Sequence, residues 1–207
     1  MKLYDVDWKS VPTPTPPEDL VKLQTYCEMA SLKGLRSMAI EVGTHTGATA
    51  ALISEWFETV VCIDPWGKYD VQPGERIATY IGEGTATIPE YAAFFENMDR
   101  IGLLERVIPI VNTVKVLDNF FDIGIALNVA LAFVDDGHTY HDCSRDIKAV
   151  MKHLADAGIL VCHDYFSGGG LSTSYAGVGE AVNEAIRLYD LEVIEQFGSI
   201  IALQRKR

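Results

Sequence analysis

The stretch from Met38 to Gly47 constrains the fold of this chain most strongly. It begins with an apolar run that carries one acid, Glu41, and that breaks at Gly43, and Gly47 then opens an alanine-rich segment. A continuous apolar run of this length is typical of a buried strand, and glycine marks a tight turn. Such a turn lets a ligand approach the backbone, and the following helix start offers unpaired N–H groups. The stretch therefore predicts a strand, a glycine turn and a helix start that can bind a small molecule.

Apolar β-branched runs alternate with amphipathic segments along the rest of the chain. Five strands are expected between helices, at 38–42, 59–63, 107–111, 129–134 and 159–162. The helix after the fourth strand is expected to continue to Gly158, with His141 and His153 on its solvated face. Residues 191–197 and 199–204 are expected to close the chain as an antiparallel hairpin. This order predicts an α/β fold with a central, mostly parallel sheet that has helices on both faces.

The length of 207 residues suits one domain, expected at 18–207, after a proline-rich arm at 1–17. Prolines at this density favour an extended backbone, so the arm could lie over the domain, cross a partner subunit in a homodimer, or be disordered. The segment 67–88 lacks clean periodicity and is long for a loop, which favours a cover over a site.

Charge and cysteine usage exclude several classes of protein. A formal net charge of -12 argues against a nucleic acid as partner. No apolar run has the length of a membrane span, and the N-terminus lacks the pattern of a signal peptide. The four cysteines are widely scattered, without the close spacing of a zinc site. Reduced thiols in the core and a cytoplasmic location are therefore expected.

Polar side chains follow nearly every expected strand. These residues are Glu41, Asp64, Asn112, Asp135, Asp136, His138, His163 and Asp164. Because ligands of open α/β sheets bind beyond the carboxyl ends of the strands, these positions predict one site. An acid that ends a buried strand needs a partner, which favours ligand binding by Glu41 over a plain turn. Asp64 lies twenty-three residues after Glu41, where a doubly wound domain places an acid on a ribose, although Asp-Pro is also a common start of a turn.

Two neighbouring strands each deliver an acid and a histidine, Asp135 with His138 and Asp164 with His163. Carboxylates beside an imidazole could hold a divalent cation and leave positions open for substrate. Alternatively, His138 is a general base that the acids orient. Capping of the next helix by Asp135 or Asp136 explains one acid but not both strands.

At these residues the chain resembles the class I S-adenosylmethionine-dependent methyltransferases. The segment from Glu41 to Gly47 is similar to their first motif, an acid before a Gly-x-x-x-Gly turn around the methionine part, and Asp64 matches the acid that holds the ribose. Three further segments, 133–140, 158–164 and 177–179, resemble the branch of small-molecule O-methyltransferases of antibiotic and sugar tailoring and its cephalosporin-modifying relatives. That branch usually reads Asp-Gly-Asp-His where this chain reads Asp135-Asp136-Gly137-His138, so the second acid is displaced by one place.

The resemblance, which covers roughly residues 20–204, implies a Rossmann-like, doubly wound, seven-stranded sheet whose last strand is antiparallel. It implies transfer of a methyl group from S-adenosylmethionine to a hydroxyl of a small polar or sugar-like acceptor, which 67–88 and 167–177 would bind. The implied cofactor-binding residues are Glu41, Gly43, Thr44, Gly47, Asp64, Asn112 and Asp135. The implied catalytic residues are His138, Asp135 and Asp164, and the implied ligands of Mg²⁺ or another divalent cation are Asp135, Asp164 and His163.

Two other functions remain open from the sequence. One is a protein that binds the nucleoside without catalysis, for regulation or assembly. A nicotinamide-dependent oxidoreductase would need Gly-x-Gly-x-x-Gly at the first turn, which Gly43-x-x-x-Gly47 does not supply.

Overall fold

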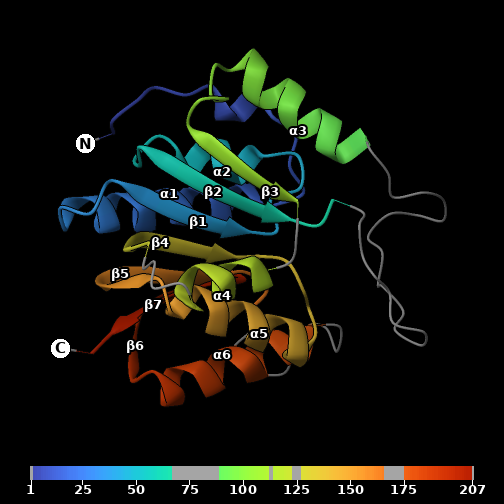
Figure 1. Cartoon of the computed structure of the whole chain (residues 1–207). Coiled ribbons are helices and arrows are strands. Elements are labelled where there is room, and N and C mark those ends of the chain that lie inside the picture. Colours follow the sequence, from blue (N-terminus) through green and yellow to red (C-terminus); the bar gives the residue numbers. More distant parts are fainter. Residues whose placement is uncertain (1, 67–88, 112–113, 123–126, 166–174, 207) are drawn as a thin grey trace, which may run out of the picture.

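The computed structural model describes residues 2–66, 89–111, 114–122, 127–165 and 175–206. Its sheet has seven strands in the order β3-β2-β1-β4-β5-β7-β6 (Figure 1). Their bounds are β1 Met38–Val42, β2 Thr59–Asp64, β3 Val107–Val111, β4 Val129–Val134, β5 Leu154–Cys162, β6 Leu191–Phe197 and β7 Ile200–Arg205. The first five strands run parallel, and β7 lies antiparallel between β5 and β6. The predicted doubly wound sheet with an antiparallel last strand is confirmed.

Helices cover both faces of the sheet. They are α1 Pro17–Leu32, α2 Ala48–Ile53, α3 Pro89–Arg100, α4 Lys115–Asp122, α5 Tyr140–Met151 and α6 Ala176–Leu188. Side chains alternate between the two faces along each strand, so neighbours such as Ala39 and Ile40 on β1 belong to different cores. One core joins the sheet to α1, α2 and α3, and the other joins it to α4, α5 and α6. None of these helices is long and apolar enough to cross a membrane.

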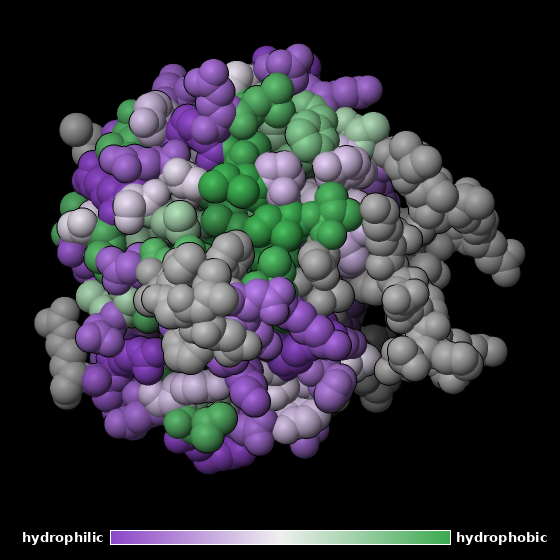
Figure 2. Space-filling model, in the orientation of Figure 1, coloured by the Kyte–Doolittle hydropathy of each residue, from purple (hydrophilic) through white to green (hydrophobic). Residues whose placement is uncertain are grey.

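The edge strand β3 is less covered than the centre of the sheet. Figure 2 shows an apolar area on the near face of the molecule, where Figure 1 places β3 beside α3. Ile108 of β3 is 47% exposed, and Pro109 follows it in the strand. Because proline donates no hydrogen bond to a ladder, an edge strand is the position where a sheet tolerates it.

The N-terminal arm lies against its own domain. The N–H groups of Leu3 and Tyr4 donate to the carbonyl of Glu55, and the hydroxyl of Thr46 donates to the carbonyl of Pro12. A short 3-10 helix, η1 Trp8–Ser10, lies between these contacts. The described part of the arm therefore contacts residues on either side of α2 in its own chain, and the predicted contact with a partner subunit stays a prediction.

The expected end of the helix after β4 is wrong. Helix α5 ends at Met151, and β5 begins at Leu154 because the N–H of Val129 pairs with the carbonyl of His153. The pairing of β4 with β5 then shifts from Val129↔Leu154 to Leu131↔Ile159, so Gly158 lies in an irregular part of a strand. The expectation of a solvated His153 is wrong too, since the ring is 2% exposed and its Nε2 lies 2.9 Å from the carbonyl oxygen of Leu117. His141 is exposed, as expected.

All four cysteines are free and buried. They lie on α1, β2, α5 and β5, inside the two cores. The expected position of the thiols in the core is confirmed, and their reduced state stays a prediction.

Candidate functional site

The carboxyl ends of β1, β2, β4 and β5 bring the expected acids and histidines to one edge of the sheet. Glu41 lies near the end of β1, Asp64 ends β2, and Asp135 follows β4 directly. The N–H of Asp135 donates to the carbonyl of Val42, and the N–H of His163 donates to the carbonyl of Val134. The parallel ladder therefore continues one step past the strands and fixes these residues side by side.

The glycine turn after β1 is packed tightly between neighbouring elements. Gly43 has a φ of +89°, and a Cβ at this position would lie 2.3 Å from the carbonyl oxygen of Asp135. Gly47 has a φ of +91°, and a Cβ there would lie 2.7 Å from the Cε of Met98 on α3. Only glycine adopts this backbone easily and leaves this space. Both glycines are thus required by contacts within the protein, and their role in ligand binding stays a prediction.

Beside this turn lies a carboxylate with unused hydrogen-bonding capacity. Glu41 is 0% exposed, and neither its oxygens nor the hydroxyl of Thr44 make a hydrogen bond of good geometry among the described residues, although the hydroxyls of Thr44 and Thr49 lie near the carboxylate. Burial raises the pKa of Glu41 to about 8, although the nearby hydroxyls of Thr49 and Thr44 act in the opposite direction. Buried polar atoms are normally paired, so these oxygens fit a site that is completed by a ligand or a bound water.

Asp64 holds the backbone around the turn. Its Oδ2 accepts a hydrogen bond from the N–H of His45 at 2.8 Å, and its Oδ1 accepts one from the N–H of Trp66 at 2.6 Å. The indole N–H of Trp66 in turn donates to the carbonyl of His45 at 2.7 Å. Burial raises the pKa of Asp64, and the backbone hydrogen bonds oppose this shift. Since a carboxylate offers about four acceptor positions, Asp64 keeps capacity for the two hydroxyls of a ribose.

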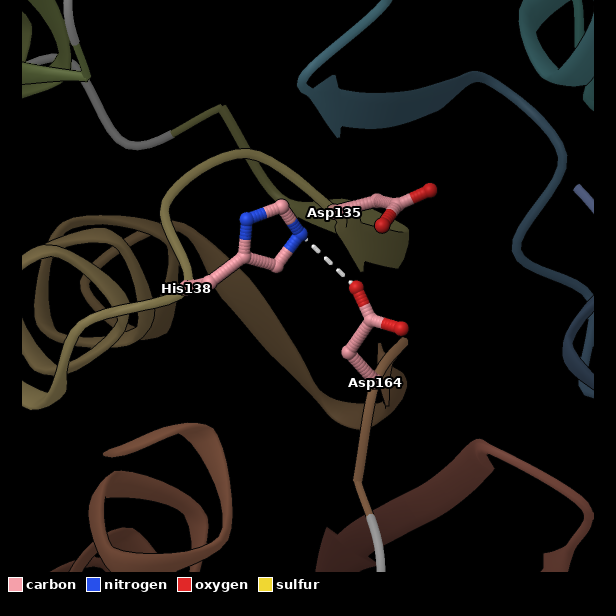
Figure 3. A group of neighbouring side chains, drawn as sticks. All are labelled: Asp135, His138 and Asp164. Carbon is pink, nitrogen blue, oxygen red and sulfur yellow. Dashed lines mark ion pairs between the residues drawn. The ribbon is translucent and has the colours of Figure 1, made fainter. Parts of the chain in front are cut away.

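Glu41, Asp64 and the glycine turn make up the first half of the site. The second half contains Asp135, His138 and Asp164. One ligand atom from each lies within 4.8 Å of the others, and Figure 3 shows the three side chains converging from the ends of β4 and β5 and from the intervening loop. The Nε2 of His138 lies 2.8 Å from the Oδ2 of Asp164. This hydrogen bond raises the pKa of His138, and burial only partly offsets it. Burial alone would raise the pKa of Asp164, but the hydrogen bonds from His138 and His163 hold it well below its usual range.

His163 stands behind this group. Its side chain is 9% exposed, with Nδ1 3.0 Å from the Oδ1 of Asp135 and Nε2 3.1 Å from the Oδ2 of Asp19. Burial would lower the pKa of His163, but Asp135 and Asp164 outweigh it and raise the pKa to about 11. Because both ring nitrogens face carboxylates, the geometry favours His138 over His163 as the nitrogen ligand of a cation. The role of His163 as a ligand, predicted from the sequence, is untested.

One residue of this site was missed by the sequence analysis. Asp19 lies in the first turn of α1, where an acid normally stabilises a helix start from solvent. Nothing in the local pattern indicates that its side chain turns inward. Only the packing of α1 against the end of β5 brings it to His163.

Several other expected positions can be placed, and some cannot. The ring of Tyr175, just before α6, lies 4.7 Å from the ring of His138. Asn112, the segment 67–88 and most of 167–177 lie outside the described residues. The predicted contacts of these segments with adenine and acceptor therefore stay predictions.

A family model described as "Methyltransferase domain" matches residues 40–165. The match begins within β1 and ends just beyond Asp164, so it contains both halves of the site except Asp19. None of the curated protein sequences compared with this chain matches it significantly.

Solved structures share the fold over nearly the whole chain. A protein of Corynebacterium glutamicum superposes with a TM-score of 0.65 at 14% identity, over 96% of this chain and 85% of that one. The calicheamicin methyltransferase CalS11 gives 0.64 at 15% identity, over 98% and 95% of the two chains. The O-methyltransferase from Bacillus cereus, in complex with SAH, gives 0.62 at 13% identity, over 95% and 86%. At this level of identity the likeness shows a common fold.

Proposed function

This chain belongs to the family of methyltransferase domains, and on that premise we propose that it transfers the methyl group of S-adenosylmethionine to a hydroxyl group of a small polar or sugar-like molecule. The observation that carries the proposal is the pairing of two unlike groups at one sheet edge. Glu41 and Asp64 flank a glycine turn at the ends of β1 and β2, and Asp135, His138 and Asp164 converge at the ends of β4 and β5.

The first group fits the cofactor. The unfilled oxygens of Glu41 and Thr44 suit hydrogen-bond donors at the methionine end, and Asp64 suits a ribose diol. With Gly43, Gly47, Asp135 and the predicted contact of Asn112, these residues would hold the nucleoside and the methionine part. The bound cofactor supplies a methyl carbon that its sulfonium already makes electrophilic. The protein then has to align an acceptor, exclude water and remove a proton.

The second group supports removal of that proton by His138. Asp164 bonds the Nε2 of His138 and fixes the ring, which leaves Nδ1 as the nitrogen that would accept the proton of the hydroxyl. The chemistry of Asp135, His138 and Asp164 also fits a divalent cation such as Mg²⁺. A cation bound there would lower the pKa of the acceptor hydroxyl, and His138 would then act as ligand instead of base.

Two observations support a small hydroxylated acceptor. Two proteins that share the fold are described as a calicheamicin methyltransferase and as an O-methyltransferase. The net charge of -12 disfavours a nucleic acid as the acceptor.

The free buried cysteines suit the cytoplasmic location that we propose.

Calorimetric titration with S-adenosylhomocysteine tests the cofactor site directly. We expect micromolar binding to the wild type and binding that is about ten- to a hundredfold weaker in Asp64→Ala, because a hydrogen bond to a charged group contributes roughly 1.5–3 kcal/mol. Asp156→Ala removes an exposed acid at the start of β5 and serves as the matched control. Absence of binding to the wild type would overturn the proposal.

Repeating the titration with Mg²⁺, and assaying methyl transfer to a panel of hydroxylated acceptors, separates the remaining alternatives. Magnesium binding that Asp164→Asn abolishes would support the cation. Turnover that His138→Gln retains at the wild-type rate would rule out the base. Tight binding of the nucleoside without transfer to any acceptor would favour the non-catalytic binder.

A further inference from the structure

A chain of alternating acids and imidazoles extends from the site into the interior. The Oδ2 of Asp164 lies 2.8 Å from the Nε2 of His138, and the Oδ1 of Asp164 lies 3.6 Å from the Nδ1 of His163. The same Nδ1 lies 3.0 Å from Asp135, and the opposite ring nitrogen lies 3.1 Å from Asp19. His138 is thereby connected to α1 through two carboxylates and one buried ring.

Asp19 does not act as an ordinary acid at a helix start. The N-cap of α1 is Pro16, and among the described residues no side chain caps this helix end. The carboxylate of Asp19 is 2% exposed and turns toward β5 and the β6–β7 turn, where its Oδ2 also accepts the hydroxyl of Ser199 at 2.5 Å. An acid in solvent also interacts favourably with the helix dipole, and it does so without the desolvation that burial imposes.

The surroundings of Asp19 are shaped to its side chain. A Cβ at Gly198 would lie 2.7 Å from the Oδ1 of Asp19, so the turn between β6 and β7 leaves room for this oxygen. That Oδ1 has no hydrogen-bond partner among the described residues. Burial of an acid that has an unpaired oxygen costs folding free energy. The interaction that offsets this cost is the ion pair with the ring of His163.

We propose that Asp19 is a positioning residue of the site: through the ring of His163 it fixes the orientation of the Asp135 and Asp164 carboxylates that face His138. This inference rests on the proposed function for its significance, since those carboxylates are the ones that would orient a base or hold a cation. Asp19 itself contacts neither His138 nor the Asp135 and Asp164 carboxylates. Its effect passes through one ring, which cannot rotate while both nitrogens are bonded to carboxylates.

Nuclear magnetic resonance of the histidine side chains tests the proposal on the full-length protein without an acceptor. The chain has only five histidines, so long-range proton–nitrogen spectra of ¹⁵N-histidine protein can be assigned with single His→Gln variants. In Asp19→Asn, which keeps the shape and removes the charge, we expect shifted signals for His163 and also for His138, which Asp19 does not contact. The exposed His45 and His141 should keep their signals.

Two variants serve as controls. Ser199→Ala removes a hydroxyl that contacts both Asp19 and the Nε2 of His163 but leaves the ion pair between these two residues, so the His163 signals should move slightly and the His138 signals should stay in place. Gly198→Ala should displace the Asp19 carboxylate without changing the charge, and it should shift His138 as Asp19→Asn does, which covers the case in which Asp19→Asn does not fold. Unchanged His138 signals in folded Asp19→Asn or Gly198→Ala would overturn the proposal.

Titration with S-adenosylhomocysteine on the same samples keeps this proposal separate from the proposed function. We expect Asp19→Asn to bind with at most about tenfold lower affinity than the wild type, because Asp135 is the described member of the cofactor group that bonds the His163 ring, while Glu41 and Asp64 should bind as before. Absence of binding to both proteins would contradict the methyltransferase function, while the histidine signals would still decide the role of Asp19.

Discussion

The two halves of the site are built by different means. Around Asp64, the carboxylate accepts hydrogen bonds from the backbone, from the N–H groups of His45 and Trp66. Around Asp164, the contacts join side chains, namely those of His138 and His163. The first half is a fixed backbone shape, and the second is a network whose members come from α1, β4, β5 and the loop after β4.

This difference determines how each half should respond to substitution. A backbone turn is destabilised when a substitution prevents its conformation. A change of charge near such a turn should affect only the residues that contact it. A network of coupled side chains transmits a change from one member to the next, and its members do not contribute independently. Substitutions placed in each half should therefore separate the two kinds of construction.

The largest effect is expected from Gly43→Ala. The new methyl group would overlap the carbonyl of Asp135, and the φ of +89° adds strain. We expect a loss of about 3 kcal/mol or more in the free energy of unfolding, since overpacking against backbone cannot be relieved by a rotamer change. Unfolding in urea measures this loss.

Gly34→Ala is the matched control for this substitution. Gly34 has a similar φ of +81°, but a Cβ there would meet no atom of the described part of the chain within 4 Å. It should lose only about 1 kcal/mol from strain. Equal losses of unfolding free energy in both variants would mean that the close packing of the turn against Asp135 does not add to the cost of Gly43→Ala.

A smaller, pH-dependent effect is expected from Glu41→Gln. The folded pKa of about 8 lies above the usual value of 4.5, so the folded protein holds this proton longer than the unfolded chain. The stability associated with Glu41 is therefore fully present below about pH 4.5 and is lost as the pH rises through 8. In Glu41→Gln that loss should disappear, and the variant should gain about 2 kcal/mol relative to wild type between pH 6.5 and pH 9.

The comparison is made from urea unfolding at several pH values. Glu58→Gln changes an exposed acid at the start of β2 and should leave the pH profile unchanged. Parallel profiles for Glu41→Gln and wild type would show that Glu41 is not held neutral by burial.

The contrast also explains which parts could be predicted from the sequence. The bounds of β1, β3 and β4 and the turn at Gly43 follow from local patterns, because apolar runs and glycines act on their own neighbourhood. The positions of Asp64 and Asp135 follow as well, since parallel strands align their carboxyl ends.

The rest depends on contacts that local patterns do not contain. Asp19 and His163 are 144 residues apart in sequence, and only the packing of α1 beside β5 joins them. His153 illustrates the same limit: its helical spacing indicates a solvated position, but the turn into β5 brings its ring to Leu117. Inward orientation of a polar side chain is a tertiary property, so the second half could be predicted only in outline.

A double-mutant cycle of Asp19→Asn and Asp164→Asn should reveal coupling within the network. Both carboxylates face the ring of His163, so the loss of one changes what the other stabilises. We expect an interaction energy of about 1 kcal/mol in urea unfolding, within the range for residues that share a hydrogen-bonded partner. Additive losses would show that the ring does not connect them.

The smallest effect is expected from the corresponding cycle of Asp64→Asn and Asp164→Asn. Both are acids at the carboxyl end of a strand, but Asp64 bonds the backbone of His45 and Trp66, whereas Asp164 bonds His138 and His163. With no partner in common, their interaction energy should stay below about 0.5 kcal/mol. Coupling as large as that between Asp19 and Asp164 would mean that charge acts across the whole edge, and the two halves would then have to be treated as one electrostatic unit.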